Sequence, residues 1–236
     1  MMEKKFCFLS LAISVIIQII VICMFLGVAQ RSDYGAYESL AMACVEEGSF
    51  YPTESQIYQD YLFAPGMVNM LVLEIWIFGS THYHMIINLI MNLFLLYCLW
   101  IVACNLFTKK VAYLSVGIFA LLHSTIFTVA ITCTEIPFLL LSLAAFAIIV
   151  DHRNRNRSIF FCIAGILLAL ANWIRPIAVI FVVAILVWMV LHKLPKEKYA
   201  FFYYYCPLNP KTTPLTFRET EVWLSAYHGQ APFVKK

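Results

Sequence analysis

The sequence predicts an all-α integral membrane protein, a polytopic helical bundle of about six spans. Its composition is 63% hydrophobic and 12% charged, whereas soluble domains carry about 45–50% apolar and about 25% charged residues. Its apolar runs are long and unbroken, as helical spans require, while the strands of a membrane barrel alternate over about 10 residues. Its basic residues are scattered over short loops, which argues against a nucleic-acid partner.

The apolar runs place the spans in order. Residues 6–28 form a 23-residue run, and a bilayer takes about 20 apolar residues. Residues 158–191 form a 34-residue run that Arg175-Pro176 divides, because proline disfavours helix in the residue before it. Residues 65–78 number only 14 and include Glu74, which predicts an interfacial helix. The six predicted spans are residues 6–28, 83–107, 111–131, 135–150, 159–174 and 177–192.

Charge sets the predicted orientation, because Lys and Arg mark cytoplasmic loops. If residues 65–78 do not span, both termini lie inside and only Arg31 and Arg175 remain at the outer face. The basic residues then predicted inside are Lys4, Lys5, Lys109, Lys110, Arg153, Arg155, Arg157, Lys193, Lys196 and Lys198.

A predicted outer loop, residues 30–82, follows the first span. Between residues 30 and 64 it carries six acidic residues against Arg31 alone, a net charge of −5. Apolar residues at helical spacing predict an amphipathic helix over 34–47, with a second interfacial helix over 65–79. Ser32 or Asp33 is expected to cap the first helix, and Gly48 and Pro52 to end it.

The final 41 residues, 196–236, differ from the rest of the chain. They carry four prolines and no apolar run of spanning length. We expect a polar cytoplasmic tail, and a truncated or frameshifted end is one interpretation of it. Residues 1–195 form the predicted transmembrane module.

A series of short motifs runs along residues 6–192. The order and spacing of these motifs resemble the membrane glycosyltransferases of the GT-C fold, nearest to the protein mannosyltransferases and lipid A aminoarabinose transferases. The resemblance implies transfer of a sugar from a dolichyl- or undecaprenyl-phosphate donor to a lipid, glycan or protein acceptor. The matching motifs are Asp33-Tyr34-Gly35-Ala36-Tyr37, Glu47-Gly48, Tyr61, Pro65-Gly66, Phe78-Gly79, Thr134-Glu135-Ile136-Pro137-Phe138 and Arg175-Pro176.

The resemblance also implies roles for individual residues. Asp33, just past the first span, takes the place of the family's catalytic carboxylate, and a carboxylate there can serve as general base toward the acceptor. Arg175 and Arg31 are the outer-face cations that can hold a lipid phosphate, since the guanidinium fork binds two oxygens. Glu135 is expected to assist acceptor or metal binding. Tyr37 and Tyr61, within matching motifs, complete the predicted substrate-binding set.

Structural interpretations stand beside these roles. Asp33 and Glu135 each stand where a helix begins, so either can be a cap, and Arg175 can be a boundary residue extending toward water. Glu74 is expected on the wet face of its interfacial helix, with lining of the site as the alternative. Asn88 and Asn92, four residues apart on one helix face, are both expected to hydrogen-bond to neighbouring helices.

Two departures from the family pattern leave alternatives open. Phe63-Ala64-Pro65-Gly66 has neither the lysine nor the second proline of the aminoarabinose branch, and the chain is about half the family's usual length. The alternative function is therefore an inactive truncated relative or a non-enzymatic membrane assembly protein. A transporter fits less well, because the spans are almost free of charge. No metal ligand set is apparent, a divalent metal remains open, and the expected location is the bacterial inner membrane with the site facing outward.

Overall fold

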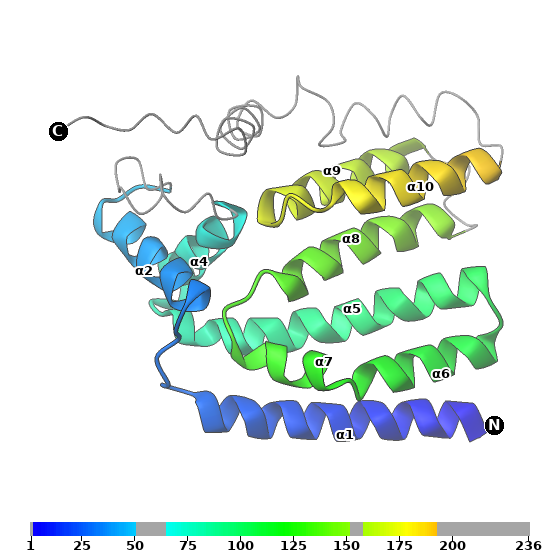
Figure 1. Cartoon of the computed structure of the whole chain (residues 1–236), viewed down its shortest axis with the longest axis horizontal. Helices are drawn as coiled ribbons and strands as arrows, with labels where there is room; N and C mark the ends of the chain where they lie inside the picture. Colours follow the sequence, from blue (N-terminus) through cyan, green and yellow to red (C-terminus); the bar gives the residue numbers. More distant parts are fainter. Residues whose placement is uncertain (1, 51–64, 152–157, 193–236) are drawn as a thin grey trace, which may run out of the picture.

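The computed structural model describes residues 2–50, 65–151 and 158–192, and every regular element within them is a helix. The long helices run side by side, and α2 (Asp33–Glu46) and α4 (Pro65–Phe78) lie together at one end of this bundle (Figure 1). The predicted all-α class is confirmed for these residues. The bundle helices are α1 (Met2–Phe25), α5 (His84–Leu106), α6 (Lys109–Ala120), α8 (Glu135–Val150), α9 (Ser158–Ile174) and α10 (Val179–Leu191).

Helix length and composition make the chain an integral membrane protein with two or three candidate spans. Within the described residues, Met2–Phe25 and Thr81–Leu106 are long and apolar enough to cross a bilayer, with 24 and 26 residues. Lys109–Ala120 with His123–Ala130 forms a third candidate, bent by 58°. Helices α4, α8, α9 and α10 are apolar but shorter. Six spans and an outer loop therefore remain predictions.

The two ends of the bundle differ in the residues they carry. The N-terminus, the turn from α5 to α6 and the end of α8 lie at one end, which holds Lys4, Lys5, Lys109 and Lys110 (Figure 1). Helices α2 and α4 and the junction from α9 to α10 lie at the opposite end (Figure 1). The described lysines thus lie at one end of the bundle, and the assignment of that end to the inside stays a prediction. Arg153, Arg155, Arg157, Lys193, Lys196 and Lys198 lie outside the described residues.

The predicted helix over 111–131 is broken after Leu121. Helix α6 ends at Ala120, and the chain continues through the short α7 (His123–Phe127) and the 3₁₀ turn η2 (Thr128–Ala130). A helix end leaves backbone carbonyls without partners in the helix. Here the Ser14 hydroxyl of α1 donates to the Ala120 carbonyl at 2.6 Å, which satisfies one of them. The break therefore depends on a residue more than 100 positions earlier.

Buried polar side chains join α1 to α5. Gln18 Nε2 donates to Ser14 Oγ at 2.7 Å, and Asn92 Nδ2 donates to Gln18 Oε1 at 3.0 Å. Asn88 Nδ2 donates to the Ile131 carbonyl at 3.1 Å. All three side chains that donate are 2% exposed or less. The prediction of a hydrogen bond to another helix is confirmed for Asn92, whereas Asn88 binds the segment between η2 and α8. Such bonds hold helices together where lipid supplies no hydrophobic drive.

Helix α2 begins without the predicted side-chain cap. Ser32 precedes the helix with φ of 57°, its side chain makes no capping bond, and Asp33 is the first helical residue. A capping side chain normally comes from an extended backbone, so the positive φ explains why Ser32 fails to cap. Gly48, at φ of 66°, follows the end of the helix as predicted, and Pro52 lies outside the described residues.

Helices α2 and α4 pack on each other and form a small core of their own. Gly66 at the start of α4 meets the end of α9, where a Cβ would come within 2.7 Å of the Trp173 carbonyl carbon. The contact holds the α2–α4 pair against the bundle. The buried residues of this core are Tyr37, Leu40, Ala41, Cys44, Met67, Val68, Leu71 and Val72.

Replacing Gly66 with alanine is expected to destabilise the protein by about 1–3 kcal/mol, the usual cost of overpacking. The added methyl would meet backbone of α9, which cannot rotate away. Gly117→Ala is the matched control, because its Cβ would come closest to the ring of Phe6, a side chain 37% exposed, and no nearer than 3.3 Å to the Cys7 backbone. Thermal unfolding in detergent would measure both variants. Equal midpoints for the two variants would contradict the tight α4–α9 contact.

Candidate functional site

An ion pair joins two of the predicted site residues at the α2–α4 end of the bundle. Arg175 Nη1 lies 2.6 Å from Glu135 Oε1. Glu135 is the first residue of α8, and Arg175 directly follows α9. A helix N-terminus favours an anion and a C-terminus a cation, so both helices place a charge of the favourable sign. Glu135 is thus both the N-terminal acid of α8 and the partner of Arg175.

This pair is open to ligands rather than enclosed. The Arg175 and Glu135 side chains are 42% and 44% exposed. Ion pairs at such exposure contribute only about 0–1 kcal/mol to stability. Glu135 engages one nitrogen of a guanidinium that has five N–H donors, which leaves capacity to bind an anion. The pair orients Arg175 without consuming it.

The Asp33 carboxylate and the Glu135–Arg175 pair act on the same tyrosine through their charges. The pKa of Tyr37 is raised to about 12, first by burial and then by the Asp33 and Glu135 carboxylates, while Arg175 acts in the opposite direction. The pKa of Tyr34 is also raised, by burial and then by Glu135. The charges of Asp33, Glu135 and Arg175 therefore all act on Tyr34 and Tyr37 near the start of α2, and Asp33 itself is exposed.

The segment before α8 supplies a buried thiol to this region. Cys133 is 1% exposed, and burial, followed by the Glu135 carboxylate, raises its pKa to about 12. A thiol reacts as its thiolate, so Cys133 stays protonated at physiological pH. It is a packing residue near Glu135, and the charged groups provide the chemistry of the site.

The remaining predicted site residues are not brought into this group. Arg31 lies exposed on the linker between α1 and α2, and within the described residues it makes no ion pair. Tyr61 lies outside the described residues. Of the two predicted outer cations, Arg175 alone stands in an ion pair with another predicted site residue.

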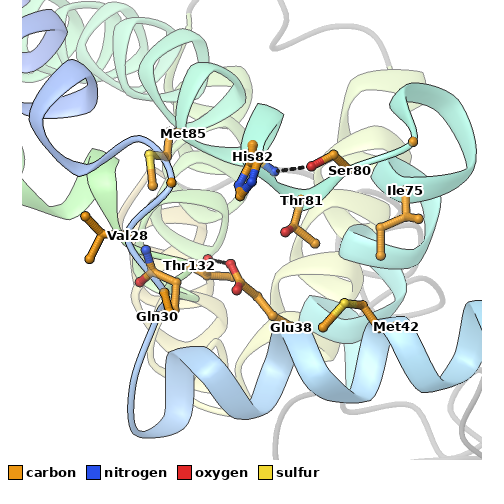
Figure 2. Close-up of a pocket in the computed structure, with 13 residues that line it drawn as sticks. Val28, Gln30, Glu38, Met42, Ile75, Ser80, Thr81, His82, Met85 and Thr132 are labelled. Atoms are coloured by element: carbon orange, nitrogen blue, oxygen red, sulfur yellow. Dashed lines mark hydrogen bonds between the residues drawn. The ribbon is translucent and has the colours of Figure 1, made fainter.

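A pocket lies on the neighbouring side of α2. It encloses about 420 Å³, and Figure 2 shows Glu38 and Met42 of α2 facing Ser80, Thr81 and His82 across it. The remaining wall comes from the linker between α1 and α2, the end of α4, Met85 and Thr132.

Glu38 is fixed at this pocket by a hydrogen bond that sequence reasoning missed. Thr132 Oγ1 donates to Glu38 Oε1 at 2.8 Å (Figure 2). In the sequence, Glu38 is one of six acidic residues between residues 30 and 64 of the predicted loop and has no predicted role. Its signal was its position four residues after Tyr34, on the same face of an amphipathic helix.

Glu74 is not on a wet face, so that prediction is wrong. Its side chain is 6% exposed, and His84 Nδ1 lies 3.1 Å from each of its carboxylate oxygens. A carboxylate among apolar residues needs a buried partner, and His84, at the start of α5, supplies it. The pair ties α4 to α5 on either side of the corner that carries Ser80, Thr81 and His82.

Breaking this buried pair is expected to be costly, whereas replacing both members is not. His84→Leu alone should destabilise the protein by about 3–5 kcal/mol, because it leaves the Glu74 carboxylate buried without a partner. The double variant with Glu74→Met should recover most of that loss. Thermal unfolding of the singles and the double would measure the coupling. A double variant that loses the sum of both single losses would contradict the pairing.

Within the described parts of the chain, no three His, Cys, Asp or Glu side chains gather as a group that could hold a metal ion. A divalent metal therefore stays a prediction, without a ligand set assigned to it. The chemistry below is derived from side chains alone.

The family of the chain follows from a comparison with known proteins. The family model for dolichyl-phosphate-mannose-protein mannosyltransferase matches residues 64–206, more than half of the chain. The chain belongs to this mannosyltransferase family. Neither a curated protein nor a solved structure matches it. The resemblance stated from the motifs is confirmed at the level of the family.

Membership in the mannosyltransferase family bears on the site in two ways. The matched residues include Glu135, Arg175, Thr132 and the Glu74–His84 pair, but they begin after Asp33 and α2. The family suggests a membrane glycosyltransferase of the mannosyltransferase type and implies a polyprenyl-phosphate sugar donor. The roles of single residues, the acceptor and the face of the membrane do not follow from this match.

Proposed function

We propose that this chain transfers a sugar from a polyprenyl-phosphate sugar to a lipid, glycan or protein acceptor at the outer face of a membrane. The observation that carries the proposal is the exposed Glu135–Arg175 pair beside α2, in a chain of the mannosyltransferase family. In this proposal, the guanidinium oriented by Glu135 binds the phosphate, and the Asp33 carboxylate acts on the acceptor.

Asp33 is the proposed general base. The acceptor O–H gives its proton to the Asp33 carboxylate while its oxygen bonds to the anomeric carbon of the sugar. The bond between that carbon and the phosphate oxygen breaks, and the polyprenyl phosphate leaves with the electron pair. A carboxylate exposed at the first turn of α2 is accessible to an acceptor from water and can take its proton.

Arg175 is the proposed phosphate ligand. Negative charge grows on the phosphate as it leaves, and a fixed cation stabilises the transition state more than the ground state. The Glu135 contact at 2.6 Å supports a positioning role for that carboxylate, since it holds the guanidinium in one orientation. In this proposal, Tyr37 is a buried packing residue that stays uncharged.

The proposed location is the bacterial inner membrane with the site facing outward. Support comes from the separation of charge along the bundle, with lysines at the starts of α1 and α6 and the site residues at the opposite end (Figure 1). Lysine-rich ends remain cytoplasmic. Helices α2 and α4 would then lie at the water–lipid boundary, where a lipid phosphate resides.

The donor class tests the proposal. Membranes containing the chain are given a radiolabelled polyprenyl-phosphate sugar or the matching nucleotide sugar, and labelled acceptor is counted. Transfer from the lipid donor alone, absent from membranes without the chain, is expected. Inserted protein without transfer from either donor would favour the alternative, an inactive relative or an assembly protein.

A further inference from the structure

The pocket beside α2 carries several polar groups and one carboxylate. Its polar groups are the Glu38 carboxylate, the Gln30 amide, the His82 ring and the hydroxyls of Ser80, Thr81 and Thr132 (Figure 2). Among the described residues that line it, none is Lys or Arg. A phosphate would meet a carboxylate there without a cation, which disfavours anions. The lining instead suits a neutral group with several hydroxyls.

The apolar part of the wall fits the same ligand. Val28, Met42, Ile75 and Met85 line the pocket between the polar groups (Figure 2). A sugar ring presents C–H groups on its faces and hydroxyls at its edge, so it needs apolar contacts and hydrogen-bond partners together. Small-molecule sites enclose about 300–1,000 Å³, and the 420 Å³ here lies within that range.

The polar groups are held in place before any ligand binds. Thr132 engages Glu38 Oε1, and a carboxylate can accept bonds on both oxygens, so Oε2 remains able to accept a hydroxyl. Ser80 Oγ accepts a hydrogen bond from the backbone N–H of His82 at 3.1 Å and fixes the opposite wall. The Glu74–His84 pair joins α4 to α5 on either side of this wall. Such preorganisation lowers the entropic cost of binding.

The pocket borders the proposed transfer site. Glu38 lies on α2 beyond Tyr34, and Thr132 lies three residues before Glu135. Two segments, α2 and the chain leading into α8, thus line the pocket and also carry Asp33 and Glu135. A molecule bound in the pocket would extend toward these charges.

We propose that this pocket binds the neutral, hydroxyl-bearing sugar ring of a substrate, with Glu38 as its main hydrogen-bond acceptor. The ring belongs either to the donor or to a glycan acceptor. The inference rests on the proposed function for its place in the reaction. Its binding chemistry rests on the lining alone.

Binding of methyl α-D-mannopyranoside to the full chain in lipid nanodiscs tests the proposal, with saturation-transfer difference NMR as the readout. Wild type should bind the mannoside. Glu38→Ala should weaken binding about tenfold or more, the effect of losing a hydrogen bond to a charged group. Glu38→Gln keeps the volume and should weaken binding less. Glu46→Gln, at the exposed far end of α2, should leave binding unchanged.

Several outcomes separate this inference from the proposed function. Mannoside binding that depends on Glu38 supports the pocket even if the chain transfers nothing. Equal binding by wild type and both Glu38 variants overturns the pocket even if transfer occurs. Crosslinking of a diazirine-bearing, sugar-free polyprenol to Met42 or Ile75 would make it a lipid-tail site and also overturn it. Where transfer occurs, a raised KM of Glu38→Gln for the donor assigns the donor sugar, and a raised KM for the acceptor assigns the glycan.

Discussion

Replacing Asp33 with asparagine is expected to lower sugar transfer by about 10²–10⁴-fold, the contribution of a general base. The change keeps the size of the side chain at the first position of α2 and removes only the ability to accept the acceptor's proton. Because Asp33 is exposed, the thermal midpoint should stay near that of wild type. Transfer is measured in membranes as radiolabelled product per inserted chain.

Glu46→Gln is the matched control for Asp33. It removes one negative charge from the last position of the same helix, at an exposed side chain. Transfer by this control should remain near the wild-type rate. An Asp33→Asn variant that is as active as the Glu46→Gln control would exclude Asp33 as the base.

Replacing Arg175 with glutamine is expected to lower transfer by about 10²–10³-fold, the usual effect of removing one transition-state electrostatic contact. Stability should fall by no more than about 1 kcal/mol, because the Glu135–Arg175 pair is over 40% exposed on both sides. Arg175→Lys should recover part of the rate, since lysine keeps the charge but lacks the planar fork. Rates and thermal midpoints of the same preparations are compared.

Arg31→Gln is the control for Arg175, and Glu135→Gln tests the positioning role. Arg31 is the other cation predicted at the outer face, exposed on the linker, and its loss should change transfer only slightly. Glu135→Gln should have an intermediate effect, since the amide oxygen still accepts from Arg175 without its charge. If Arg31→Gln proves as damaging as Arg175→Gln, the phosphate site would have to be reassigned.

Much of the helix pattern could be predicted because it depends on the hydropathy of residues close together in the sequence. The division at Arg175-Pro176 is confirmed, since α9 ends at Ile174 and α10 begins at Val179. A proline acts through its own ring and needs no tertiary partner. The two helices expected over 34–47 and 65–79 also occur, each within one residue of the prediction.

The break after Leu121 could not be predicted in the same way. The run over 111–131 contains no proline and reads as one span. The carbonyl freed at the end of α6 is satisfied by Ser14, a residue of another helix. The hydropathy of residues 111–131 does not indicate a partner in another helix.

The candidate site shows the same limit. Glu135 and Arg175 stand 40 positions apart and meet only through the packing of α8 on α9, so their pairing had no local signal. The family motifs singled out Glu135, and the charge pattern together with the motifs singled out Arg175. Glu74 was misplaced because its partner, His84, belongs to a different helix. A carboxylate in an apolar run is itself a signal that a buried partner exists.

The most direct test of the central claim is transfer by the purified chain alone. The protein is reconstituted in lipid vesicles with a radiolabelled polyprenyl-phosphate sugar and an extract of membrane acceptors, and labelled product is followed over time. The proposed function predicts product that rises in proportion to the amount of chain and disappears in the Asp33→Asn variant. Folded, inserted protein that forms no product, or forms it equally with Asp33→Asn, would contradict it.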